Sequence, residues 1–332
     1  MRKKKLIGLI PIGLMLVVAL SGCVEEKTQK VYHVGILSGL DFFANTADGF
    51  KEKMTELGYV EGENIVYDVQ KSNFDIATYR NILNKFVADK VDLIFVFPTE
   101  ASQEAKAATN GTDIPVVFAN SFTEDTNLVN SVREPGGNIT GVQWVGSDLA
   151  LQRFEIMREL VPEAKQMLVP YQRGYPIVKS QLAALRSAFA SEGITLIEVP
   201  ADNATSLEAE LQKQEKSFNN ETVVILMIAE PLCVTPDDFV VLGRFAEEHK
   251  IPLGGAFMSF GGYVSIYGLT PQNVPQGRQA AFLADKILRG VPAGTIPVVS
   301  AEGYFQLNYT AAQKFGLSVS EGLLSRVDEI IQ

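Results

Sequence analysis

The chain has 332 residues, with 29 Lys and Arg against 39 Asp and Glu, which gives a formal net charge of −10. This acidic balance argues against a nucleic-acid partner, which normally requires a basic face. The length exceeds what one small core organises and predicts two domains.

Residues 1–22 have the pattern of a secretory signal peptide. Basic residues at 2–5 precede an apolar run over 6–20, which is shorter than the roughly 20 residues that a helix needs to span a bilayer. Small residues follow, as at a cleavage site. The ending Leu20-Ser21-Gly22-Cys23 resembles a lipobox, which implies that Cys23 is lipidated and becomes the first mature residue. An uncleaved N-terminal membrane helix is the alternative.

Residues 23–30 are short and polar, as expected of a flexible tether. A single acyl chain binds a membrane only marginally, so anchoring through Cys23 implies two or three chains. Four basic residues lie in the signal, which leaves 25 basic against 39 acidic residues in the mature part. We therefore expect an extracytoplasmic, monomeric protein that is lipid-anchored to the cell membrane.

The remaining sequence alternates strand and helix patterns in two series, which predicts two doubly wound α/β domains. Short apolar runs predict strands at 31–38, 65–70, 91–97, 116–120, 139–144, 166–170, 195–199, 223–228, 253–256 and 264–267. Helical spacing of apolar residues predicts helices at 44–57, 75–89, 100–108, 148–160, 176–191, 206–217, 236–248, 275–289 and 308–315.

No enzyme motif is present in the sequence. The glycine-rich run at 136–141 lacks the dinucleotide spacing and precedes a strand pattern, so it predicts a turn; there is no P-loop and no nucleophile elbow. His33 and His249 are far apart, and Cys233 is the one cysteine after Cys23, which argues against a zinc site and an internal disulfide. We expect no metal, no cofactor and no catalysis. An exported hydrolase would need a nucleophile, a base and an acid that two isolated histidines do not supply.

Six sequence motifs resemble the tryptophan/tyrosine-type family of ABC transporter substrate-binding proteins. They are FKEKMTELGYVEGEN at 50–64, DIPVVFA at 113–119, EPGGNITGV at 134–142, GRQA at 277–280, FQLN at 305–308 and LLSRVDE at 323–329. Each motif is moderately specific by itself, and their order behind a lipobox is more specific.

The resemblance implies a type I periplasmic-binding fold, in which two Rossmann-like α/β lobes with parallel sheets are joined by three hinge crossings. Crossings near 120, 268 and 300 would give a first lobe of 31–120 and 268–300 and a second lobe of 121–267 and 301–332. The implied function is to capture a small molecule in the cleft between the lobes and deliver it to the permease subunits of an ABC importer. A ligand-sensing domain that feeds a membrane receptor or kinase would share this fold and stays open.

Candidate ligand-binding residues follow from the position of ligands in open α/β sheets, beyond the carboxyl ends of the strands. In the first lobe they are Ser38, Gly39, Asp41, Thr99, Glu100, Ser102, Asn120, Ser121 and Phe122. In the second lobe they are Tyr171, Tyr175, Glu230 and Phe257. Tyr267 and Trp144, the single tryptophan, lie near crossings, and Trp144 is a candidate for stacking on a ligand. Helix capping by the hydroxyls and packing of the aromatic rings are the alternatives.

The sequence departs from amino-acid-binding relatives at two strand ends. Those relatives commonly carry an Asn-Pro-type turn where this chain has YQRGYP at 171–176, and an Asp where it has FMS at 257–259. An α-amino group needs a nearby carboxylate, which Glu230 or Asp41 would have to supply. The aromatic residues favour a small, partly apolar ligand, with an aromatic amino acid as the leading hypothesis.

Overall fold

Apolar strands of the first lobe form a six-stranded parallel sheet in the order β13-β5-β4-β3-β1-β2. The computed structural model describes residues 30–216, 218, 222–228 and 230–332, so the predicted signal and Cys23 lie outside the described residues. The strands are β1 (Tyr32–Ser38), β2 (Ile65–Lys71), β3 (Leu93–Phe97), β4 (Val116–Phe122), β5 (Ile139–Trp144) and β13 (Val299–Ser300). Every residue of β3, β4 and β5 is buried, as expected of strands covered on both faces.

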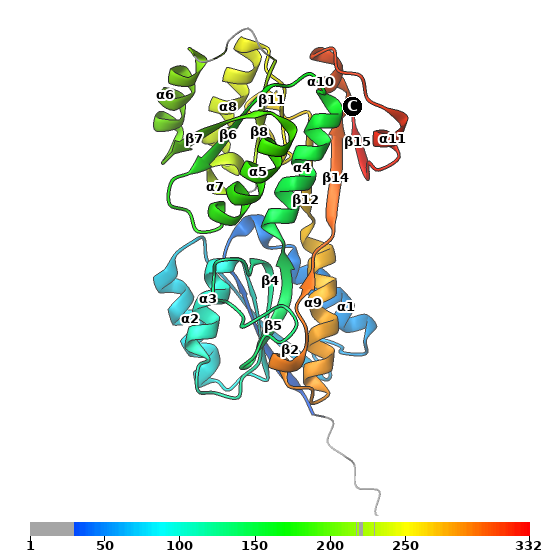
Figure 1. Ribbon diagram of the computed structural model, residues 1–332. Coiled ribbons are helices and arrows are strands. Elements are labelled where there is room, and N and C mark those ends of the chain that lie inside the picture. The colour runs from blue at the N-terminus through cyan, green and yellow to red at the C-terminus, as the bar shows by residue number, and fades with distance from the viewer. Residues whose placement is uncertain (1–29, 217, 219–221, 229) are drawn as a thin grey trace, which may run out of the picture. The chain divides into compact units, whose positions relative to one another are not determined.

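Helices cover both faces of this sheet (Figure 1). They are α1 (Thr46–Glu56), α2 (Ile76–Ala88), α3 (Thr99–Ala108) and α9 (Asn273–Leu288), with short 3-10 turns η1 (Asp41–Phe43) and η2 (Ala293–Thr295). Helices α1 and α9 pack on one core, and α2 and α3 on the other. A Cβ at Gly277 would lie only 2.0 Å from Thr46 O, so glycine permits the close approach of α9 to α1.

The second lobe repeats this architecture around a four-stranded parallel sheet in the order β7-β6-β8-β9. Its strands are β6 (Gln166–Gln172), β7 (Thr195–Ala201), β8 (Val223–Leu226) and β9 (Leu253–Gly254). Its helices are α4 (Gly146–Leu160), α5 (Val178–Glu192), α6 (Ala204–Glu215), α7 (Pro231–Val234) and α8 (Pro236–His249). Helices α4 and α5 pack on one core, and α6, α7 and α8 on the other.

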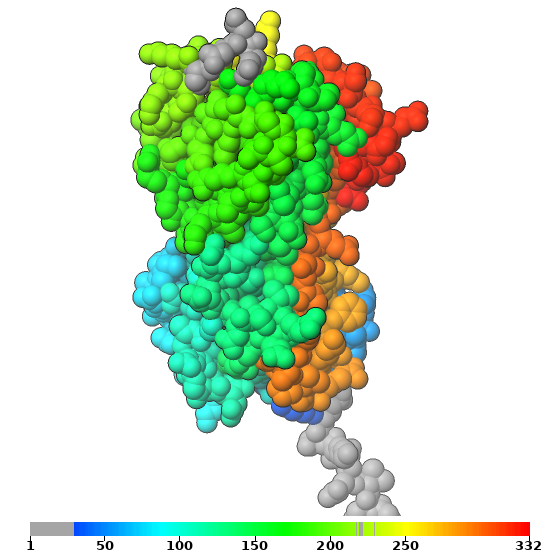
Figure 2. Space-filling model, viewed as in Figure 1, coloured from blue at the N-terminus to red at the C-terminus, as the bar shows by residue number. Residues whose placement is uncertain are grey.

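The C-terminal part adds a three-stranded sheet that the sequence did not predict. Its order is β12-β14-β15, with β12 (Tyr267–Pro271), β14 (Gly303–Asn308) and β15 (Glu329–Ile331). Two further helices are α10 (Tyr309–Lys314) and α11 (Glu321–Leu324), and β10 (Ser259–Phe260) and β11 (Tyr263–Val264) form a hairpin. The sheet's core residues join the α4 side of the second lobe. Figure 2 shows the orange C-terminal segment continuing from one lobe to the other along one side of this view.

The chain crosses between the lobes three times, but two of the predicted positions need correction. Residues 139–144 form β5, whose Trp144 pairs with Phe122 of β4, so the first crossing follows Trp144 instead of lying near 120. The second crossing follows Pro271, because all of β12 pairs with β14. The third lies between Ser300 and Gly303, close to the predicted 300. A buried strand has the same sequence pattern whichever sheet it joins, so the pattern does not reveal that 121–144 belong to the first lobe.

Candidate functional site

The first strand end is built around Gly39, which follows β1. Gly39 N donates to Phe97 O at 2.7 Å, and Tyr79 Oη donates to Gly39 O at 2.6 Å. A Cβ at Gly39 would lie 2.7 Å from Tyr79 Oη and 2.9 Å from Phe97 O, so a side chain does not fit here. Ser38 is buried, whereas Asp41, in η1, is exposed.

Three hydroxyls near the start of α3 bond to protein groups of the first lobe. Thr99 Oγ1 accepts from Phe122 N at 3.0 Å, and Ser102 Oγ lies 2.9 Å from Ser121 Oγ and donates to Pro98 O at 2.8 Å. Ser102 and Ser121 are fully buried. These candidates hold α3 against β4, and each of their hydroxyls already has a hydrogen-bond partner within the protein.

Asn120 lies at the centre of a buried polar network that includes two residues not predicted from the sequence, Thr46 and Gln276. Asn120 Nδ2 donates to Thr46 Oγ1 at 2.7 Å, and Gln276 Nε2 donates to Asn120 Oδ1 at 2.5 Å. Gln276 Oε1 accepts from Asn120 N at 3.2 Å and from Trp144 Nε1 at 2.7 Å. The φ of Asn120 is +48°, a left-handed conformation that asparagine tolerates better than most residues. The network joins β4, α1, α9 and the first crossing.

Trp144 belongs to an aromatic cluster at the first crossing, together with Phe43 and Phe122. Its ring centroid lies 5.5 Å from that of Phe122 and 6.2 Å from that of Phe43, both edge-on. The indole is only 5% exposed. The sequence hypothesis that Trp144 stacks on a ligand therefore requires these rings to part, while packing at the crossing is what the structure shows directly.

Tyr171 and its neighbours form a contact inside the second lobe. Tyr171 Oη donates to Glu198 Oε2 at 2.9 Å, and Arg186 donates to both oxygens of the same carboxylate. The hydrogen bond from Arg186 holds the pKa of Glu198 below its usual range. The Tyr171 hydroxyl thus links β6 to β7, and its partner Glu198 belongs to the same lobe.

Glu230 is a buried carboxylate that organises two strand ends of the second lobe. Its Oε2 accepts from Gln172 N at 3.0 Å and from Leu232 N at 3.3 Å, and its Oε1 accepts from Cys233 N at 3.0 Å. Only 3% of the residue is exposed, and this burial raises its pKa to about 7. The backbone donors act in the opposite direction, since they favour the ionised form. Both oxygens therefore already have protein partners.

Tyr175 is the candidate that reaches the other lobe. Its hydroxyl donates to Glu100 Oε1 at 2.7 Å, which joins the loop after β6 to the first turn of α3. Burial and the nearby Glu100 raise the pKa of Tyr175 well above its usual value, and Glu230 contributes in the same direction. Glu230 lies beside this contact, because it accepts from Gln172 N, and Gln172 O in turn accepts from Tyr175 N at 3.2 Å. We call Glu100, Tyr175 and Glu230 the acidic interlobe group.

Two other candidates pack against backbone groups of their own lobe. Tyr267 is fully buried, and its hydroxyl donates to Arg153 O. Phe257 is half-buried next to Gly268, where an added Cβ would meet Phe257 N at 2.0 Å. Sequence reasoning had no signal for Arg153, a fully buried guanidinium whose Nε and Nη2 donate to Leu269 O at 2.9 and 2.6 Å. Burial lowers its pKa to about 10.

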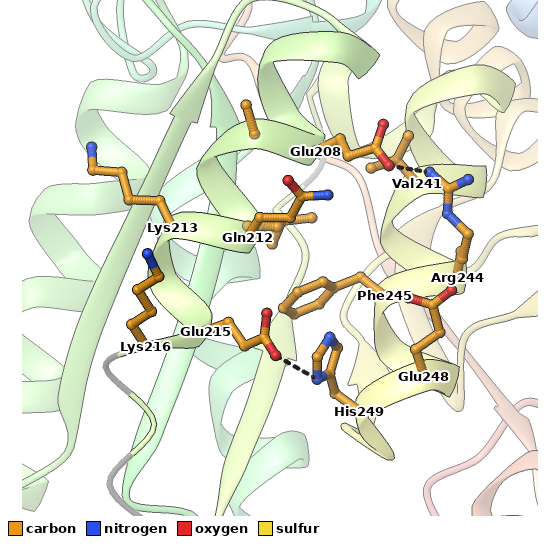
Figure 3. A pocket seen from close by; sticks show the side chains of 12 residues that line it. Glu208, Gln212, Lys213, Glu215, Lys216, Val241, Arg244, Phe245, Glu248 and His249 are labelled. Carbon is orange, nitrogen blue, oxygen red and sulfur yellow. Dashed lines mark hydrogen bonds and ion pairs between the residues drawn. The ribbon is translucent and has the colours of Figure 1, made fainter.

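A separate surface hollow lies between α6 and α8, with a volume of about 680 Å³ (Figure 3). Two pairs of its ionisable side chains lie close together. Arg244 Nη2 lies 2.8 Å from Glu208 Oε1, and His249 Nδ1 lies 3.8 Å from Glu215 Oε1. All the lining residues belong to these two helices and their ends, and none follows a strand. The hollow therefore does not share the strand-end position of the candidates.

Within the described ranges, no group of three or more His, Cys, Asp or Glu is placed to hold a metal ion. The same residues contain no helix that is both long and apolar enough to cross a bilayer. The polar chemistry that the described strand ends offer is therefore carboxylates, hydroxyls and amides.

Comparison with known proteins identifies the family. The family model described as ABC transporter substrate binding protein matches residues 34–331. This chain belongs to that family. It is an extracytoplasmic substrate-binding protein that takes a small-molecule ligand and works with an ABC transporter.

Individual relatives agree with this assignment. The chain is 27% identical over 321 residues to a tyrosine-binding protein of Clostridioides difficile, with 91% of this chain and 89% of the relative covered. A conserved domain protein of Vibrio cholerae has a similar solved structure, with a TM-score of 0.76, 25% identity and coverage of 91% of this chain and all of that one. An ABC domain from Streptococcus pneumoniae in complex with L-Trp has a TM-score of 0.75 at 20% identity, with 91% of this chain and 100% of that chain covered. These structures establish the two-lobed periplasmic-binding fold.

Proposed function

We propose that this substrate-binding protein captures an aromatic amino acid, with tyrosine and tryptophan as the leading ligands, and catalyses no reaction itself. The acidic interlobe group carries the proposal, because it sets two carboxylates and a tyrosine at the facing strand ends. A relative described as tyrosine-binding and a similar fold solved with L-Trp support the same ligand class.

Glu100 is the carboxylate best placed to hold the ligand's ammonium group. No Lys, Arg or His of the described chain forms an ion pair with Glu100 or Glu230. Glu230 uses both oxygens on backbone donors, whereas Glu100 accepts from Tyr175 through Oε1 and has Oε2 free for another donor. An ammonium group would donate a strong, charge-assisted hydrogen bond to Glu100 Oε2 and balance the negative charge of this carboxylate. Asp41 stays exposed and is the weaker alternative.

Isothermal titration of the purified full-length protein tests the ligand class. We expect tyrosine or tryptophan to bind, and sugars and nucleobases to give no heat. Binding of a sugar without any aromatic amino acid would refute the proposal.

A comparison of two ligands tests the role of Glu100. The variant Glu100→Gln should weaken tyrosine about tenfold more than it weakens 3-(4-hydroxyphenyl)propionate, which lacks the ammonium and shares only the weakened contact with Tyr175. Glu104→Gln is the matched control, since Glu104 lies on the same helix but pairs with Arg80 at 2.8 Å. An equal loss for both ligands would contradict ammonium binding by Glu100.

We also propose that Cys23 carries a lipid anchor and that the protein acts as a monomer. The sequence before Cys23 supports the anchor. Mass spectrometry of the N-terminal peptide from the native membrane should show diacylated Cys23 as the first residue, and Cys23→Ala should release the protein from the membrane fraction. An unmodified Cys23 in membrane-bound protein would refute the anchor. Light scattering of the purified protein tests the monomer.

A further inference from the structure

We propose that the hydrogen bond from Tyr175 to Glu100 is a latch that holds the two lobes closed. The donor stands after β6 of the second lobe and the acceptor in the first turn of α3 of the first lobe, 2.7 Å apart. The latch goes beyond the proposed ligand, because it joins two protein groups and would act whatever molecule is captured.

The Tyr175–Glu100 bond lies far enough from the crossings that a small hinge rotation would break it. In the first sheet β3, which precedes Glu100, lies two strands from the crossing strand β5. In the second sheet β6, which precedes Tyr175, lies two strands from β9, whose end is bridged to the crossing strand β12. At about 4.8 Å between strands, Glu100 stands roughly 10 Å and Tyr175 roughly 14 Å from the crossing strands. A hinge rotation of about 15° would then part them by roughly 3–4 Å, which breaks a hydrogen bond.

Both ends of the bond are held firmly by their own lobes. The ring of Tyr175 packs against the core of the second lobe, and Glu100 lies in the first turn of a helix, where a negative charge is favoured. Since burial raises the pKa of Tyr175, its hydroxyl stays protonated and able to donate at physiological pH. A fixed donor and a charged acceptor make a stronger contact than two mobile surface groups.

A second interlobe contact provides a comparison. Lys179 Nζ of α5 lies 3.7 Å from Asp125 Oδ1, and the Lys179 side chain is 82% exposed. Exposed ion pairs of this kind contribute little, because water screens the charges and two flexible side chains must be ordered. A further contact, from Ser147 of α4 to Glu124, lies directly at the first crossing, where a hinge rotation separates the groups least. The latch function is therefore assigned to the Tyr175–Glu100 bond.

The test measures lobe closure without any ligand. Nitroxide labels on Asn84→Cys of α2 and Ser187→Cys of α5, both exposed positions, report the distance between the lobes by pulsed dipolar spectroscopy. The unsubstituted full-length protein, carried through the same labelling, gives the background. Tyr175→Phe and Glu100→Ala should each shift the distribution toward longer distances, and the double variant should shift it no further, because both changes remove the same bond.

Two control variants carry matched changes. Tyr59→Phe removes a tyrosine hydroxyl that donates to Asp285 at 3.0 Å within the first lobe, and Lys179→Met removes the exposed interlobe pair. Both should leave the distribution as in the parent protein. An unchanged distribution in Tyr175→Phe, or the same shift in Tyr59→Phe, would overturn the latch. Circular dichroism confirms that each variant is folded.

Ligand kinetics provide a second measurement. Without the latch, tyrosine should dissociate about tenfold faster, the effect of losing one hydrogen bond to a charged group, while its association rate changes less than twofold. The loss should be equal for tyrosine and 3-(4-hydroxyphenyl)propionate in Tyr175→Phe; a loss confined to tyrosine would assign Tyr175 to ligand contact and overturn the latch. If the parent protein binds no aromatic amino acid, the proposed ligand fails, whereas the ligand-free distances still decide the latch.

Discussion

The facing strand ends of the two lobes carry different chemistry. In the first lobe the polar side chains mostly bond to one another: Ser102 to Ser121, and Asn120 to Gln276. In the second lobe Glu230 collects backbone donors, and Tyr175 reaches out to the opposite lobe. The first lobe thus offers a largely internally satisfied surface on which Glu100 and the exposed Asp41 are the charged candidates, while the second provides the group that bridges. A strand-end position brings a residue close to the cleft between the lobes, but the hydrogen-bond partners of the residue decide whether it holds its own lobe together or contacts the other lobe.

The internally satisfied surface of the first lobe depends most on Gly39. In Gly39→Val the new side chain would meet Tyr79 Oη and Phe97 O, whose backbone cannot retreat, so the free energy of unfolding should fall by about 3 kcal/mol. Chemical denaturation measures this loss. Gly322→Ala is the control, because its nearest neighbour would be Ser320 Oγ at 3.8 Å, and it should change stability by less than about 0.5 kcal/mol. Equal stability of Gly39→Val and the parent would show that this strand end is not rigid.

The buried network of the first lobe gives the next largest effect. Gln276→Leu would leave Asn120 and the Trp144 indole without their partner, at a cost of about 2–3 kcal/mol in unfolding free energy. The fluorescence of Trp144, the only tryptophan, should change in the folded state. Gln279→Leu on the same helix is the control, since Gln279 makes one long contact of 3.5 Å to Ser300 O. Equal unfolding free energies for Gln276→Leu and Gln279→Leu would show that the network does not stabilise the first crossing.

The buried carboxylate of the second lobe should make stability depend on pH. Because the pKa of Glu230 is raised from 4.5 to about 7, the folded state holds this proton more tightly than the unfolded chain. Its contribution is complete below the unfolded pKa and is lost as the pH rises through 7. Relative to Glu230→Gln, the parent's unfolding free energy should fall by on the order of 2 kcal/mol over this window.

Glu198 supplies a control of opposite sign for this measurement. Its pKa is lowered by the hydrogen bond from Arg186, so its contribution is present above the unfolded pKa and is lost as the pH falls. As the pH falls below 4.5, the parent should therefore lose stability relative to Glu198→Gln, whereas between pH 4.5 and 7 the difference between them should stay constant. A pH dependence that survives in Glu230→Gln would assign the titration to another group.

The smallest effect is expected for Tyr171, which contrasts with Tyr175 within the same lobe. Tyr171→Phe removes a bond to Glu198, which keeps both contacts from Arg186, so the unfolding free energy should fall by only about 0.5 kcal/mol. Thermal denaturation measures this change. If Tyr171→Phe lowered the affinity for tyrosine as much as Tyr175→Phe does, Tyr171 would be a ligand-binding residue and the two tyrosines would not differ in function.

Much of the fold could be predicted from local patterns. The apolar runs of β3 and β6 and the spacing in α4 and α8 indicated their elements within a few residues, because buried strands and amphipathic helices impose short periods on the sequence. The position of β5 could not be predicted, since sheet membership depends on pairing between distant residues such as Phe122 and Trp144. The three-stranded sheet around β14 was missed for the same reason.

The sequence by itself determined two α/β lobes, a chain without an enzyme motif, and strand-end candidates for the site. Only the tertiary structure decided what each candidate contacts: Tyr267 lies in the core, Tyr171 stays within its lobe, and Tyr175 bridges to Glu100. It also revealed Thr46, Gln276 and Arg153, which no motif distinguishes. The physical reason is that secondary structure follows from neighbours along the chain, whereas a hydrogen-bond partner follows from which distant elements pack together.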